Sequence, residues 1–363
     1  MLFNIQHAFS LSDSAVGVLL AIAVAVAGAS SAVMAHLADR VGARRLLWIA
    51  LFAWSGLLMI MATIHQRWPF TVALVLVEIA GGSIDTAMNA DASHRLVDNP
   101  AGLVRFHALF NGGALVGAAA AGVIIRAGAS WRWVWPGIAC VAVAVGIWAL
   151  LTDPGTAMAP AGSATVIQAA HPWQRLRREG LLVLLGVFAL AEITEGGVDT
   201  WGVLYLRNHL ATGVLLGAGA YVVGQLVAAT TRGAGGGLLG RLSSRRALMV
   251  GGCVAGGGIL LESLSPTPVA AAVGLALGAG GASLFWPLVM STVSRLASQV
   301  VSAVGTFTAA GYIGWVAGAP VVGWVSQSYG PERGLQLLAL AAAGVALSSR
   351  LIPERSPGPG TAR

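Results

Sequence analysis

The chain has 363 residues, of which 56% are hydrophobic and only 10% are charged, against roughly 25% charged in soluble domains. This composition excludes an ordinary soluble globular domain, and it excludes a disordered chain, which needs low hydrophobicity and high charge. The net charge is +7, but all basic residues are arginines spread thinly between apolar runs, which does not indicate a nucleic-acid-binding protein. The two cysteines, Cys140 and Cys253, lie inside apolar runs and predict neither a disulfide framework nor a metal site.

The apolar runs predict an all-α membrane protein. A membrane-spanning helix needs about 20 predominantly apolar residues. Eleven stretches meet this requirement, in chain order 14–37, 44–64, 69–94, 103–127, 132–151, 180–206, 213–240, 246–263, 267–294, 299–327 and 332–351. The stretch 246–263 is the shortest and is rich in glycine, which makes it the weakest of these predictions.

A linker is predicted between the fifth and sixth stretches, because residues 152–179 contain several prolines and arginines among small residues. We therefore expect four regions in the chain: an N-terminal bundle of five helices over 1–151, the linker over 152–179, a C-terminal bundle of six helices over 180–352 and a tail over 353–363.

The arginines indicate an orientation, because positive residues near span ends favour the cytoplasmic side. With the linker in the cytoplasm, fifteen arginines fall on that side and five on the other, while Arg232 falls inside a span. The C-terminal tail is then cytoplasmic.

The two halves of the chain match at a constant offset of 201 residues, so that Arg40 pairs with Arg241 and Arg44 with Arg245. Parallel repeats of this kind are a known transporter architecture. The offset leaves the stretch 180–206 without a counterpart. We therefore expect that one helix is missing before residue 1, through a start codon assigned too late or, alternatively, through a natural truncation.

Ionisable side chains recur on single faces of two predicted spans. Glu78, Asp85 and Asn89 are spaced i, i+7, i+11, which places Asp85 and Asn89 each within about 20° of Glu78 on a helix. Glu192, Glu195 and Asp199 are spaced i, i+3, i+7 and share a face in the same way. Such residues cost about 2.5–3.5 kcal/mol each at the bilayer centre, so they indicate a cavity or a paired site.

Clustered carboxylates in a low-dielectric environment tend to hold protons, which suits proton-coupled transport. The candidates for proton coupling are Asp85, Glu195, Asp199, Glu192 and Glu78. The alternative is that Arg232 neutralises one or two of these acids in a structural pair between helices, and Glu78 could instead face a neighbouring helix. The candidates for a substrate cavity are Asn89, Asn111, His107, Arg232, Trp201 and Trp286, each of which could also serve packing or hydrogen bonding.

The segment 36–45, after the first predicted span, resembles the signature loop of the major facilitator superfamily, G-x-L-A-D-R-x-G-R-R. It has His36 in place of the first glycine, and the second-half copy around Arg241 keeps the arginines but lacks the acid. The residues that carry the resemblance, and that we interpret as a conformational switch, are Asp39, Arg40, Gly42, Arg44, Arg45 and Arg241. The alternative is that these arginines only set the membrane topology.

The resemblance covers essentially the whole chain. It implies the major facilitator fold, with two pseudo-symmetric helical bundles, of which eleven transmembrane helices (five and six) are present and the first of twelve is missing. The segments 85–89 and 105–113 are similar to the fucose–proton symporter branch and its bacterial relatives.

The resemblance also implies a function. It is that of a secondary active transporter of a small solute in the bacterial cytoplasmic (inner) membrane, working by alternating access as a monomer, with protons as partners and no cofactor.

Other functions remain open at this point. A multidrug or metabolite efflux pump is one alternative, and a truncated membrane protein that does not transport is another. An integral membrane enzyme is not expected, because the chain has no H-E-x-x-H motif, no P-loop and no nucleophile elbow, and its loops are short.

Overall fold

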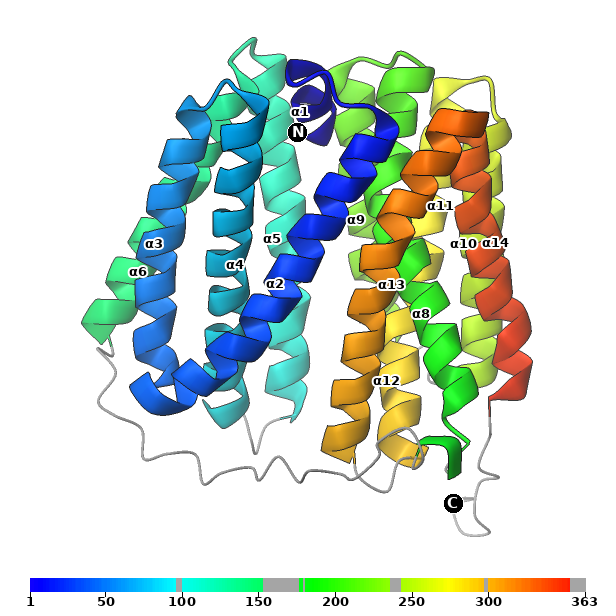
Figure 1. The fold of residues 1–363 in the computed structure, drawn as a ribbon. Helices are drawn as coiled ribbons and strands as arrows, with labels where there is room; N and C mark the ends of the chain where they lie inside the picture. The colour runs from blue at the N-terminus through cyan, green and yellow to red at the C-terminus, as the bar shows by residue number, and fades with distance from the viewer. Residues whose placement is uncertain (96–99, 153–175, 179, 236–242, 297–299, 353–363) are drawn as a thin grey trace. The chain divides into compact units, whose positions relative to one another are not determined.

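The structure is a computed structural model that describes residues 1–95, 100–152, 176–178, 180–235, 243–296 and 300–352 (Figure 1). Within this part of the chain all regular secondary structure is helical, as the apolar runs predict. The chain divides into two compact units, Met1–Gln168 and Ala169–Arg363. The predicted linker falls largely outside the described residues.

The first unit begins with a short helix and continues with the five long helices expected from the sequence. They are α1 (Leu2–Ala8), α2 (Asp13–Val41), α3 (Ala43–Thr63), α4 (Arg67–Arg95), α5 (Pro100–Arg126) and α6 (Val134–Thr152), the last preceded by a 3₁₀ turn at Trp131–Trp133. Helix α3 packs against both α4 and α6, and α2 crosses α4 at a slant (Figure 1). At that crossing the hydroxyl groups of Ser31 and Thr86 donate across the two helices, to Gly82 O at 3.2 Å and Ser31 O at 3.2 Å.

Gly42 alone connects α2 to α3. Its φ of +89° lies in the left-handed region, which costs a residue with a Cβ but not glycine. The one-residue connection keeps the start of α3 next to the end of α2. Gly42 therefore has a backbone role that accounts for its place in the predicted switch loop.

The second unit contains seven α-helices among its described residues. They are α8 (Leu182–Gly197), α9 (Val214–Gly235), α10 (Ser244–Leu264), α11 (Pro268–Ala282), α12 (Phe285–Leu296), α13 (Val300–Tyr329) and α14 (Pro331–Ser348). Helix α10 packs against α11 and α14, α11 against α9, and α8 against α13 and α14. The glycine-rich stretch 246–263, the weakest prediction from the sequence, is a continuous helix with a Ser243 N-cap.

Two of the predicted helices of this unit are irregular. The predicted span 267–294 is confirmed as a candidate span over Pro268–Met290, but its helix is interrupted at Ser283 and Leu284, between α11 and α12. The stretch 180–206 continues beyond α8 as two π-helical turns, Val198–Gly202 and Tyr205–His209. Such π-turns are rare and occur frequently at functional sites.

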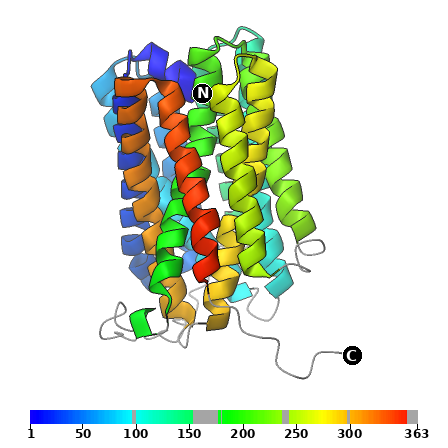
Figure 2. The ribbon, with the colours of Figure 1, turned by 90° about the vertical axis from the view of Figure 1, so that its right-hand side faces the viewer.

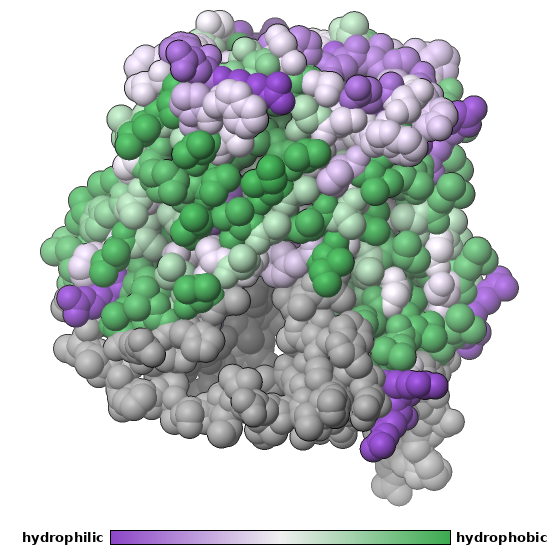
Figure 3. Space-filling view, viewed as in Figure 1, coloured by the Kyte–Doolittle hydropathy of each residue, from purple (hydrophilic) through white to green (hydrophobic). Residues whose placement is uncertain are grey.

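Large apolar side chains cover the outward flanks of both units, as expected of surfaces in contact with lipid. In Figure 3 hydrophobic residues cover the visible flank of each unit, and hydrophilic residues collect at the upper helix ends. Within the described residues, eight helical segments are long and apolar enough to cross a membrane. The count of eleven spans and the extra helix before residue 1 stay predictions.

The contact between α10 and α11 generates a test of the fold. A Cβ at position 258 would lie 2.5 Å from the backbone nitrogen of Gly278, whereas a Cβ at the adjacent position 257 would meet nothing within 4 Å. We expect Gly258→Ala to lower stability by about 1–3 kcal/mol, because the helix backbones must move apart. Gly257→Ala should be neutral or slightly stabilising.

Thermal unfolding of the two purified variants in detergent compares them directly. Equal midpoints for Gly258→Ala and Gly257→Ala would contradict the close helix contact.

Candidate functional site

The polar face of α4 forms as the spacing predicts. Asn89 Nδ2 donates to Asp85 Oδ1 at 2.9 Å, one helical turn apart. Asp85 is exposed within the described structure, while Glu78, two turns earlier, is half-buried. An exposed carboxylate held by an amide on a membrane helix can accept a proton, or a hydrogen bond from a hydroxyl group of a solute.

The predicted switch loop is partly described. The side chains of Asp39 and Arg40 and the whole of Arg241 lie outside the described residues, and Arg45 is exposed. Arg44 is the loop residue whose side chain forms an ion pair and a hydrogen bond in the described structure.

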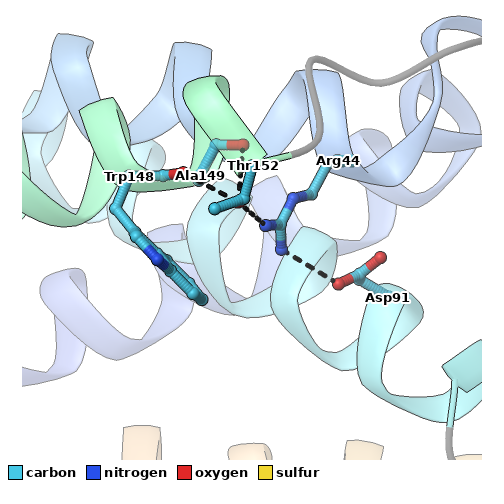
Figure 4. A network of polar contacts seen from close by, with 5 residues as sticks. All are labelled: Arg44, Asp91, Trp148, Ala149 and Thr152. Carbon is cyan, nitrogen blue, oxygen red and sulfur yellow. Dashed lines mark hydrogen bonds and ion pairs between the residues drawn. The ribbon is translucent and has the colours of Figure 1, made fainter.

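Arg44 connects three helices of the first unit (Figure 4). Its Nη1 pairs with Asp91 Oδ2 on α4 at 3.3 Å, and its Nη2 donates to Thr152 Oγ1 on α6 at 3.2 Å. The guanidinium also lies over the Trp148 ring, 5.7 Å from its centroid. Both charged side chains are almost fully buried, at 14% and 11% exposure, so the pair is much less screened than a surface ion pair.

Asp91 was missed in the sequence, although it lies on the same predicted span as Asp85. The signal was available, because an acid near a span end that carries several arginines is a natural counter-ion. Asp91 lies off the helix face that Glu78 and Asp85 share, so the periodicity of those acids does not include it.

The main polar cluster of the second unit lies between α8 and α9. Arg232 of α9 donates through Nη2 to Glu195 Oε1 of α8, and both side chains are about one-quarter exposed. This pair is the structural neutralisation that the sequence left open as an alternative. The pair does not exclude proton exchange at Glu195, which stays a prediction.

Arg232 also satisfies a carbonyl that the helix cannot. Pro287 has no N–H to donate to Ser283 four residues earlier, which leaves the Ser283 carbonyl without a helical partner at the α11–α12 break. Arg232 Nε donates to that oxygen at 2.8 Å. One guanidinium therefore joins α8, α9 and the break.

Asp199 lies one turn beyond Glu195, in the first π-helical turn. Gln225 Nε2 of α9 donates to Asp199 Oδ1 at 2.8 Å. Gln225 is buried and was not singled out in the sequence, because an uncharged amide in an apolar span gives no periodic signal. Gln225 and Arg232 are therefore two donors on α9 that bond to two acids. These are Asp199, in the π-helical turn after α8, and Glu195 on α8.

Glu192 lies on α8 where that helix packs against α13. A Cβ at Gly311 would lie 3.1 Å from Glu192 Cγ, and the Trp315 ring packs against Gly196. Within the described structure, Glu192 Oε1 and Trp315 Nε1 are buried, and the Trp315 side chain interacts with the Glu192 carboxylate. Buried polar groups are normally satisfied, so this acid and this indole form a polar contact between α8 and α13.

Glu262 on α10 is a further acid that the sequence analysis did not single out. It is fully buried, and both of its carboxylate oxygens lack a hydrogen-bond partner within the described residues. It packs against Gly202 of the first π-helical turn. An acid inside the predicted span 246–263 was the available signal.

The remaining predicted cavity residues differ in their surroundings. Trp201 is buried in the second unit and packs inside it, whereas Trp286 is 41% exposed at the start of α12. The side chains of His107 and Asn111 lie outside the described residues. Within the described part of the chain, no three His, Cys, Asp or Glu side chains are grouped as metal ligands.

Comparison with known proteins finds a family model and a relative that each match most of the chain. Residues 1–319 match the family model described as Major Facilitator Superfamily. The membrane protein MosC of Rhizobium meliloti is 26% identical over 357 residues, which cover 95% of this chain and 83% of that protein.

Two solved structures resemble the fold. The nucleoside transporter NupG gives a TM-score of 0.77 at 14% identity, over 97% of this chain and 94% of that chain. A bacterial homolog of the human lysosomal transporter Spinster, in an inward-facing and occupied conformation, gives 0.72 at 16% identity, over 96% and 90%. At these identities the likeness shows the fold alone.

The Arg232–Glu195 pair can be tested by neutralising each partner and then both. We expect Arg232→Gln and Glu195→Gln each to destabilise the protein by about 1–2 kcal/mol, less than the 3–5 kcal/mol of fully buried pairs because solvent screens this pair in part. The double variant should cost less than the sum, since two amides can still hydrogen-bond.

Thermal unfolding of the three variants in detergent measures this coupling, with Arg126→Gln, an exposed arginine at the end of α5, as the control. Strictly additive costs would show that the two side chains do not interact.

Proposed function

The chain belongs to the major facilitator superfamily, and we propose that it moves a small polar solute together with protons across the bacterial cytoplasmic membrane by alternating access. Membership of this family makes the chain a multi-pass membrane transporter and not an enzyme. The coupling ion, the solute class and the membrane are our additions. The observation that carries the proposed ion-coupled transport is the polar cluster of α8 and α9, because charged and amide groups inside a membrane unit mark ion and solute pathways.

The hydrogen bonds of this cluster support the proposal of proton coupling. Protonation of Glu195 would weaken its hold on the Arg232 guanidinium, which would remain attached to the Ser283 carbonyl at the α11–α12 break. Protonation of Asp199 would remove the charge that Gln225 now stabilises. A proton arriving at α8 therefore changes how α8 is tied to α9 and to the break, which is the kind of change that a rocking movement requires. Glu192 and Glu78 are further proposed carriers.

The first unit contributes, besides Glu78, another proposed carrier and a latch. Asp85 is the proposed proton carrier, and Asn89, bonded to it, is a proposed solute ligand. The Arg44–Asp91 pair ties the ends of α3 and α4 together at the predicted cytoplasmic side. We propose that this pair, with Asp39, Arg40, Gly42, Arg45 and Arg241, acts as the conformational switch.

The solute class rests on two likenesses. NupG is a nucleoside transporter, and the segment 85–89 resembles the fucose–proton symporter branch. Nucleosides and hexoses share several hydroxyl groups on a compact ring, which amide and guanidinium side chains bind and tryptophan rings stack against. The proposed cavity set is Asn89, Asn111, His107, Arg232, Trp201 and Trp286.

The topology is also a proposal. The bundles over 1–151 and 180–352 are joined by a cytoplasmic linker at 152–179, and the tail at 353–363 is cytoplasmic, as the arginine distribution predicts. We further propose that the protein works as a monomer.

Flux measurements test the proposed function. The purified protein is reconstituted into liposomes and given radiolabelled nucleosides and hexoses, with the outside more acidic than the inside. For proton symport we expect accumulation that grows as the external pH falls below the internal pH and that a protonophore abolishes.

The direction of flow decides between the alternatives. Accumulation driven by the opposite pH gradient, or transport of lipophilic cations in place of hydroxylated solutes, would favour an efflux pump. No flux of any of these solutes under either gradient would contradict the proposal.

Neutral substitutions separate proton coupling from solute binding. We expect Asp85→Asn and Asp199→Asn to lose accumulation driven by the pH gradient but to keep solute exchange without a gradient, because an amide cannot release a proton. Asp13→Asn is the matched control, since Asp13 lies at the start of α2 and accepts a hydrogen bond from Gln6. If both test variants accumulate solute as the unsubstituted protein does, the assignment of these two acids is wrong.

A further inference from the structure

A small pocket lies where α10 begins and α14 ends, within the second unit. It has a volume of about 280 Å³, and the described residues that line it are Arg245, Arg246, Met249 and Arg350. Arg245 and Arg246 belong to the first turn of α10, and Arg350 belongs to the 3₁₀ turn Ser349–Leu351 that follows α14. Helices α10 and α14 lie side by side, and these two ends meet on the same side of the unit (Figure 2).

Among the described residues, the pocket gathers positive charge without a protein counter-ion. Three arginines line one small volume, and no described carboxylate forms an ion pair with any of them. Mutual repulsion makes such a cluster unfavourable unless an anion occupies it. The start of α10 adds to the positive potential, because helix N-termini carry partial positive charge.

Arginine is suited to one class of anion in particular. Its planar guanidinium donates two parallel hydrogen bonds to phosphate oxygens, which a point charge cannot do. Three guanidinium groups from two helix ends match a phosphate group approached from several directions. Met249 supplies an apolar wall beside this charge.

The surroundings of the pocket distinguish a lipid from a soluble anion. On α10 the exposed residues Arg246, Val250 and Val254 are four residues apart and share one face. On α14 and the turn after it, Leu340, Leu347 and Leu351 form a similar exposed face, with Arg350 next to its end. The pocket is thus placed where two apolar flanks stop, which is the level of lipid headgroups at a membrane surface.

We propose that this pocket binds the phosphate of an anionic phospholipid headgroup, with Arg245, Arg246 and Arg350 as ligands and Met249 against the glycerol region. Basic pockets between transmembrane helices on the cytoplasmic side are a recognised mode of anionic lipid binding. The predicted orientation puts these three arginines on that side. The competing explanation is that they only set the topology, and it predicts no dependence on the lipid.

Lipid binding can be measured on the intact protein without knowledge of the transported solute. The purified protein is incorporated into phosphatidylcholine nanodiscs containing a small fraction of spin-labelled phosphatidylglycerol, and the immobilised fraction of the label is recorded. The Arg245→Gln/Arg350→Gln variant should bind the labelled lipid roughly tenfold or more weakly, since it loses two of three basic ligands. Labelled phosphatidylcholine should show no preference in either protein.

The control variant Arg177→Gln/Arg178→Gln removes the same charge from two exposed arginines of the second unit that do not line the pocket. It should bind phosphatidylglycerol as the unsubstituted protein does. An Arg245→Lys/Arg350→Lys variant, which keeps the charge and the topology signal, should fall between the two and guards against misfolding of the glutamine variant.

Three results would overturn the proposal. Equal losses in the pocket and control variants would show only general attraction of basic residues to an anionic surface. An unchanged affinity in the pocket variant would show that the arginines do not bind the lipid. Displacement of the labelled lipid by millimolar inorganic phosphate, with phosphate binding lost in the same variant, would make the occupant a soluble phosphate.

Discussion

Arg232 shows how the second unit satisfies charge and backbone groups inside a membrane protein. An isolated charge in hydrocarbon is costly, and an unpaired carbonyl there costs several kcal/mol as well. Pro287 creates such a carbonyl at Ser283, and Glu195 adds a carboxylate one helix away. A single guanidinium from α9 bonds to both, so that α8, α9 and the α11–α12 break are held together by groups that would each be unfavourable alone. Asp199 lies one turn along from Glu195, and its Gln225 donor also comes from α9.

The cost of an unpaired charge in the membrane also explains why arginines at different positions of this chain have different contacts. Arg232 lies within a span and pairs there. Arg44 lies at a helix end of the first unit and joins three helices through Asp91, Thr152 and the Trp148 ring. The arginines around the start of α10 have no protein partner within the described structure, which is why we assign them an external phosphate. Because the pairs at Arg232 and Arg44 are only partly solvated, protonation or rearrangement of one partner changes the contact substantially. This property suits a protein that must exchange one set of contacts for another during a transport cycle.

Much of this arrangement was predictable from residue order. The long apolar stretches predict the helices, because about 20 apolar residues are what a bilayer requires, and the described helices match them closely. The face shared by Asp85 and Asn89 follows from helical periodicity, and their hydrogen bond confirms it. The predicted span 267–294 is confirmed over Pro268–Met290, but the interruption of its helix at Ser283 and Leu284, just before Pro287, was not predicted. Proline is tolerated in membrane helices, so its presence alone does not say whether a helix bends or breaks.

The sequence by itself determined the class of the protein, its helices, the signature loop and the set of intramembrane acids, since these depend on composition and on spacing along one helix. The tertiary structure decided which partner each polar group has. Glu195 pairs with Arg232 from 37 residues away, Asp199 with Gln225, and Arg44 with Asp91, while Glu262 retains two unpaired oxygens within the described residues. Periodicity places a side chain on a face of its own helix but does not say which helix packs against that face. That choice depends on how small residues let particular helices approach, as α10 and α11 do at Gly258, and it exists only once the helices are packed.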